Sequence, residues 1–141
     1  MPAFWDTSAI LHICVPGQAS RAAKALLRAQ TPVIWWMAPV EVYSALERLR
    51  SEGVLTSAAY GASKERLRAL LASWREIQPS EQVRQQAYVQ LERFRLRASD
   101  ALHLSAALVW CKQKPNGRLF ICNDERLATA AHQAGFRIAA A

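Results

Sequence analysis

Short strand-like runs alternate with longer helix-like segments along the whole chain, and this alternation constrains the fold more than any other feature. Runs rich in β-branched and aromatic residues predict strands at residues 3–5, 33–37, 75–78, 119–122 and 136–138. Apolar residues at helical spacing predict helices at residues 9–15, 19–29, 39–53, 56–73, 80–94, 99–112 and 125–134. Strands joined through helices by short connections favour a parallel sheet with helices on both faces. We therefore expect a single α/β domain over residues 1–141.

The chain is strongly basic. Its 141 residues include 18 lysines and arginines against 11 aspartates and glutamates, which gives a formal net charge of +7. A protein with this balance often meets a polyanion or an acidic protein partner. Charge alone is equally compatible with a basic surface that binds nothing. The positions of the few acids are therefore more informative than the total.

No part of the sequence indicates a membrane or a secretory route. No stretch reaches the roughly 18 uninterrupted apolar residues of a membrane span, and the opening residues MPAFWDTS lack the basic segment of a signal peptide. The three cysteines, Cys14, Cys111 and Cys122, are widely spaced, so neither disulfides nor a zinc site are indicated. We expect a cytoplasmic protein with reduced thiols and no membrane association.

Acidic residues fall at the predicted junctions that lead into helices. Asp6 follows the first predicted strand, Asp124 follows the fourth, and Asp100 opens the helix at 99–112. Glu41 lies in the first turn of the helix that follows the second strand. Taken singly, each is explained by helix capping, because aspartate is a favoured N-cap and a first-turn acid complements the helix dipole.

Taken together, the four acids indicate a metal site. Ligands of an open parallel sheet bind at the carboxyl ends of its strands, where Asp6, Glu41 and Asp124 would project, and Asp100 joins them if its helix packs alongside. Converging carboxylates repel one another unless a cation is present. Mg²⁺ takes a few carboxylates and keeps several waters. One or two such ions activate water and neutralise phosphate charge during in-line displacement.

Four segments resemble the successive motifs of PIN-domain ribonucleases: FWDTSAIL (4–11), PVEVYSALERL (39–49), LRASDALHLSAAL (96–108) and FICNDERLATAA (120–131). The resemblance implies an α/β/α sandwich around a parallel sheet and RNA cleavage that depends on Mg²⁺ or Mn²⁺. It implies that the catalytic, metal-holding residues are Asp6, Glu41, Asp100 and Asp124.

The resemblance also assigns supporting roles. Thr7, Ser8 and Asn123 match positions that support the acids through hydrogen bonds. Cys122 stands where many relatives have threonine or serine. Because a thiol is a poor hydrogen-bond donor, weaker support is expected near Asp124.

A free-standing chain of this size resembles the VapC toxins of type II toxin–antitoxin pairs. That likeness implies RNA as the substrate, a cognate antitoxin as the partner and a homodimer as the assembly. Two alternatives remain open from the sequence: a non-toxin PIN nuclease that processes RNA, and a non-catalytic RNA-binding PIN module. The complete set of acids argues against the second alternative.

Basic and histidine residues near Asp100 have two possible roles. Arg93, Arg95 and Arg97 precede it and form either a solvated face or a path for RNA phosphates, so they are candidate RNA-binding residues. His103 follows Asp100 by three residues. It is explained better as a helix histidine beside a carboxylate than as a metal ligand, because hard ions prefer oxygen.

Other enzyme classes lack their required residues. A phosphatase with a nucleophilic aspartate usually has a second acid two residues after the first, and position 8 is serine. No paired nucleophile and base supports covalent catalysis. No GxGxxG motif occurs among the five glycines, which disfavours a dinucleotide-binding module.

Overall fold

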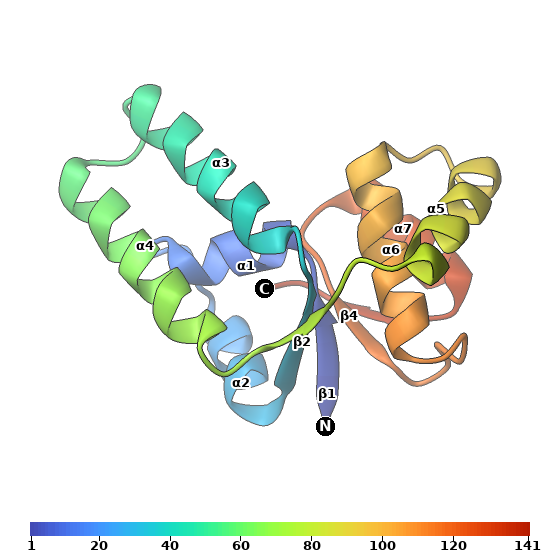
Figure 1. The fold of residues 1–141 in the computed structure, drawn as a ribbon. Coiled ribbons are helices and arrows are strands. Elements are labelled where there is room, and N and C mark those ends of the chain that lie inside the picture. The colour runs from blue at the N-terminus through green and yellow to red at the C-terminus, as the bar shows by residue number, and fades with distance from the viewer.

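The computed structural model describes residues 1–141 and contains five strands and seven helices (Figure 1). In chain order they are β1 (Pro2–Trp5), α1 (Thr7–Cys14), α2 (Arg21–Ala29), β2 (Thr31–Trp35), α3 (Ala38–Ser51), α4 (Ser57–Leu71), β3 (Arg75–Ile77), α5 (Glu81–Arg93), α6 (Ala98–Trp110), β4 (Leu119–Ile121), α7 (Glu125–Ala134) and β5 (Arg137–Ala139). None of the helices combines the length and apolarity that a bilayer crossing requires.

All strand pairs are parallel, and the strand order is β3-β2-β1-β4-β5. The central strand β1 pairs Phe4 with Val33 of β2 on one side and with Phe120 of β4 on the other. The chain therefore runs from the central strand β1 through β2 to β3 at one edge of the sheet. It then returns to the centre at β4 and reaches the other edge at β5. The crevice between β1 and β4 is the switch point of such a sheet, where ligands bind beyond the carboxyl ends of the strands.

Helices cover both faces of the sheet, as the alternation of segments predicts. Alternate residues of β1 point to opposite faces, so Phe4 joins one core cluster while Ala3 and Trp5 join the other. The first cluster contains residues of α5, α6 and α7, and the second contains residues of α1 to α4. The two groups of helices lie on opposite sides of the strands in Figure 1. The α/β/α architecture is confirmed.

Two element boundaries differ from the sequence prediction in ways that affect the site. Strand β2 ends at Trp35 instead of residue 37, because Trp36 and Met37 form the turn into α3. Pro32 is tolerated inside β2 because pairing with β3 begins one residue later, at Val33. Helix α6 begins at Ala98, so Asp100 lies within its first turn and does not cap it.

Candidate metal centre

The four predicted acids line one cavity of about 370 Å³ at the carboxyl ends of the strands. Asp6 directly follows β1, and Asp124 follows β4. Glu41 lies in the first turn of α3, and Asp100 lies in the first turn of α6. The structure thus brings together the residues that the sequence places at separate junctions.

Asp6 is the most deeply buried of these acids, with 3% of its surface exposed. Its carboxylate accepts hydrogen bonds from the Ser8 hydroxyl, at 2.8 and 3.0 Å, and from the backbone N–H of Ala9, at 3.1 Å. Its own N–H donates to the carbonyl of Ile121, which joins the ends of β1 and β4. Burial raises the pKa of Asp6, whereas the His103 charge and these hydrogen bonds oppose that rise.

Glu41 is held by two side chains from other elements. The Thr7 hydroxyl donates to Glu41 Oε1 at 3.1 Å, and His103 Nε2 lies 2.7 Å from the same oxygen. Because a carboxylate only accepts, Nε2 must carry the hydrogen. His103 is buried, and its Nδ1 has no hydrogen-bond partner. The histidine does lie beside a carboxylate, as predicted, but its hydrogen-bond partner is Glu41 and not Asp100.

Asp124 and Asp100 complete the cavity. Asp124 caps α7 by accepting from the N–H of Leu127 at 3.0 Å. Burial raises the pKa of Asp100, and the negative charge of Asp124 raises it further, followed by the charges of Asp6 and Glu41. The same three carboxylates line the cavity with Asp100, so their charges disfavour its ionised form.

The hydroxyls of Thr7 and Ser8 donate to Glu41 and Asp6, whereas the side chain of Asn123 does not contact an acid. That side chain instead pairs with Ala141, through bonds of 3.0 and 2.8 Å. Asn123 reaches the acids only through its backbone N–H, which donates to the Ser8 hydroxyl at 2.8 Å. The Cys122 thiol donates to the Asp124 carbonyl at 3.3 Å, so it does support the backbone there.

The donor set suits a hard, hydrated cation. None of the four acids forms an ion pair with lysine or arginine, and the one basic side chain in contact with them is His103, beside Glu41. No group of three or more histidine, cysteine or acidic side chains is placed to hold one metal ion directly. The carboxylates line a shared cavity and do not form a closed cage. This arrangement fits Mg²⁺, which binds through one or two carboxylates and several waters.

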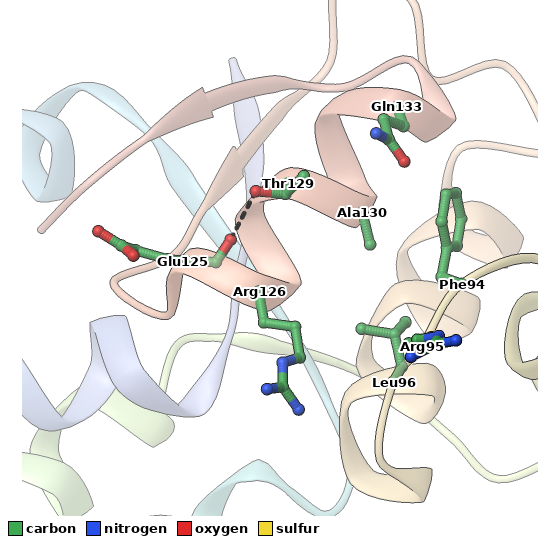
Figure 2. A pocket seen from close by; sticks show the side chains of 8 residues that line it. All are labelled: Phe94, Arg95, Leu96, Glu125, Arg126, Thr129, Ala130 and Gln133. Carbon is green, nitrogen blue, oxygen red and sulfur yellow. Dashed lines mark hydrogen bonds between the residues drawn. The ribbon is translucent and has the colours of Figure 1, made fainter.

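Two of the three candidate RNA-binding arginines lie along a surface that begins at the acids. A cavity of about 580 Å³ is shared by Arg97, Asp100, Asp124 and Arg126. Arg95 lines a further cavity, drawn in Figure 2. The Arg93 side chain lines neither of these cavities.

The Arg93 guanidinium lies over the ring of Phe94, 4.9 Å from the ring centroid, and within 3.5 Å of the Gln133 carbonyl. This contact places it at the end of α7, away from the acids. Its contact with RNA stays a prediction, as do those of Arg95 and Arg97.

Two arginines at this site were not predicted from the sequence. Arg48 lines the acid cavity, and Arg126 lies beside Asp124. A signal was present for Arg48, which follows Glu41 by seven residues and so lies two turns along the same face of α3. Arg126 follows Asp124 by two residues, and no comparable spacing marks it.

A family model described as "PIN domain" matches residues 3–133. The chain belongs to the PIN-domain family. No curated protein sequence matches this PIN domain.

Solved structures share the fold of this PIN domain. One is a toxin–antitoxin complex from Klebsiella pneumoniae, with a TM-score of 0.63 and 18% sequence identity, covering 89% of this chain and 90% of that chain. Another is PAE2754 from Pyrobaculum aerophilum, with a TM-score of 0.64 and 16% identity, covering 98% of this chain and 89% of that chain. At these identities the likeness shows the fold alone.

Proposed function

We propose that this PIN domain is a metal-dependent endoribonuclease that hydrolyses RNA phosphodiester bonds. The observation that carries the proposal is the cavity at the switch point of the sheet, lined by Asp6, Glu41, Asp100 and Asp124. Such a cluster is costly in a folded protein, because its members disfavour one another's charge. A bound divalent cation removes that cost. The net charge of +7 favours a polyanionic substrate.

The four acids would hold one or two ions, partly through bound water. Asp6 and Asp124 would contribute from the ends of β1 and β4, and Glu41 and Asp100 from the first turns of α3 and α6. When bound, one or two Mg²⁺ or Mn²⁺ ions supply an activated water and neutralise charge on the phosphate.

Other residues orient the acids and the substrate. Ser8 fixes Asp6, while Thr7 and His103 fix one oxygen of Glu41 and leave its second oxygen free for the cavity. Arg48 lines the cavity without an ion-pair partner, so it is available to pair with an entering phosphate.

We further propose that the protein is the toxin of a type II toxin–antitoxin pair. The similar structure from Klebsiella pneumoniae, a toxin–antitoxin complex, supports this role, and a cognate antitoxin is then the partner. A toxin that cuts cellular RNA acts in the cytoplasm. Exposed apolar side chains at the start of α3, Met37 and Val40, with Trp36 before them, support a homodimer or an antitoxin contact.

The test is cleavage of a labelled single-stranded RNA by the purified protein, with Mn²⁺ or with chelator. We expect cleavage only with metal, and sequencing of the new RNA ends identifies the cut sites. Glu92→Gln, a change at an exposed acid of α5 outside the cavity, is the matched control and should cleave like the wild type. Metal-dependent cleavage that is equal in Asp100→Asn and wild type would exclude the proposed site.

A further inference from the structure

The cavity of Figure 2 continues the acid site along one face of the molecule. Asp100 and Asp124 belong both to the acid cavity and to the cavity with Arg97. Glu125 and Arg126 belong both to that second cavity and to the cavity of Figure 2. Shared walls join the three hollows into one track, which runs from the metal-holding acids to the cleft between α7 and residues 94–96.

We propose that this track binds a single RNA strand, with Arg97 and Arg126 on a phosphate next to the scissile bond and the following base in the cleft of Figure 2. This inference rests on the proposed nuclease function. It adds a base-binding site, which gives the enzyme its preference for sequence beside the cut.

Two arginines line the middle of the track, which they share with three acidic residues. Arg97 comes from the start of α6 and Arg126 from the first turn of α7, so they approach from two sides. Both are exposed, and neither has an ion-pair partner in the structure. Guanidinium groups without a carboxylate partner are free to form bidentate hydrogen bonds with phosphate.

The far end of the track has the chemistry of a base site. Its volume of about 640 Å³ is ample for one nucleotide, and Phe94, Leu96 and Ala130 give it apolar walls. Gln133 and Arg95 add hydrogen-bonding groups at its edge, as Figure 2 shows. Unstacked RNA bases bind in this way, by stacking on an aromatic ring and bonding through their edges.

Two polar groups of the cleft do not oppose this assignment. The Thr129 hydroxyl donates to the Glu125 carbonyl at 2.8 Å, so it is already satisfied. The Glu125 carboxylate points away from Phe94, Leu96 and Ala130 in Figure 2. That carboxylate is therefore directed away from the apolar walls of the cleft, although Glu125 also lines the middle cavity.

A protein segment fits this track less well than RNA does. Three of the eight residues that line the cleft are apolar, and two are arginines. A separate groove along α1 and α3, which includes Leu11, Val15 and Leu49, is more apolar and contains no arginine. The positive charge and the continuity with the acids favour a nucleic acid in the cleft.

Binding to RNA that lacks single bases tests the inference. Asp6→Asn prevents cleavage and serves as the parent protein, and the RNA contains a cut site mapped with the wild type. We remove one base at a time and measure affinity for the parent and for Phe94→Leu and Gln133→Ala made in it. Leucine keeps the apolar contacts of Phe94 with the core but removes its ring. Tyr88→Leu, a change at an exposed aromatic residue of α5, is the matched control.

We expect one position beside the cut at which removal of the base weakens binding to the parent by roughly 5- to 150-fold, as loss of one stacked base does. The same removal should have little further effect in Phe94→Leu, because the stacking is already lost. Arg126→Ala should weaken binding to every RNA, whereas Arg21→Ala on α2 should not.

The inference is overturned if removal of a base has the same effect in parent and Phe94→Leu at every position. It is also overturned if the cleft variants bind all RNAs like the parent, since the cleft then serves another partner. The nuclease function and the base-binding cleft are tested separately. A wild type that never cuts RNA contradicts the nuclease function, whereas cutting without a base effect contradicts only the cleft.

Discussion

The acid cavity and the arginine-lined part of the track differ in how firmly the fold holds their side chains. Asp6 is buried, and three hydrogen bonds from Ser8 and Ala9 fix its carboxylate. Arg97 and Arg126 are exposed and have no ion-pair partner. Asp6 and Glu41 therefore have fixed carboxylates, which suits metal binding, whereas the arginines are unpaired positive charges at the surface, which suits a flexible polyanion. The effects of substitutions in the two regions should therefore differ in magnitude and in the property that changes.

The largest effect is expected in the acid cavity. Asp6→Asn and Asp100→Asn should each lower the rate of RNA cleavage by more than about 100-fold, since even residues that only orient metal ligands cost roughly 10- to 100-fold. The fold should persist, because asparagine at position 6 can still cap α1 and Asp100 caps no helix. Cleavage rate and circular dichroism of the same samples check both statements. Activity within a few-fold of the wild type would remove these acids from the site.

A smaller loss is expected from the residue that holds Glu41. His103→Ala removes the hydrogen bond of 2.7 Å to Glu41 Oε1 and should lower the cleavage rate by roughly 10- to 100-fold. His103→Gln keeps an N–H donor at a similar reach and should recover part of the rate. Raising the Mn²⁺ concentration should recover activity in the alanine variant if the defect lies in metal binding. Equal rates in the glutamine and alanine variants would contradict an orienting role.

The arginines should change affinity and its salt dependence, with little effect on metal binding. Arg97→Ala should lower the magnitude of the salt slope of RNA affinity by roughly 0.7, the value for one phosphate contact on a single strand. The loss should be similar for unrelated RNAs, because phosphates carry no sequence information. Arg93→Ala should have the smaller effect, since that guanidinium is engaged by Phe94 and Gln133. Equal slopes in both variants and the parent would place the RNA elsewhere.

The smallest effect is expected on stability without metal. The pKa of Asp100 is raised from its usual 3.8 by burial and by the charge of Asp124. An acid whose pKa rises on folding binds its proton more tightly in the folded state, so stability falls as pH rises from 3.8 through the raised pKa. Asp100→Asn removes this cost.

With chelator present, the Tm of Asp100→Asn should therefore match the wild type near pH 4 and exceed it at pH 7. A difference of a few degrees is expected, because ~1 kcal/mol moves Tm by about 4 °C in a domain of this size. Glu92→Gln, outside the cavity, should show no such trend. A Tm difference that does not change with pH would mean that repulsion between the acids is negligible.

Much of this molecule could be predicted from local sequence. Periodicity along the chain predicted the strands and helices, and their alternation predicted the parallel sheet. The acids were found because the ends of parallel strands share one edge of a sheet, so Asp6 and Asp124 had to meet there.

Side-chain partners depend on packing between distant elements, and the sequence did not predict them. His103 and Glu41 are 62 residues apart and meet because α6 and α3 both begin at the cavity. Asn123 was assigned to the acids but pairs with Ala141, because β4 and β5 are neighbours in the sheet. Strand β2 was placed two residues too late because the aromatic Trp36 has strand propensity but lies in a turn.

Direct binding of Mn²⁺ tests the central claim, that the four carboxylates form a divalent metal site. Calorimetric titration of wild type, Asp6→Asn, Asp100→Asn and the control Glu92→Gln measures it without RNA or catalysis. We predict saturable binding by the wild type and the control, and greatly weakened binding by both cavity variants. Equal Mn²⁺ binding by all four proteins, or none by the wild type at millimolar metal, would contradict the account.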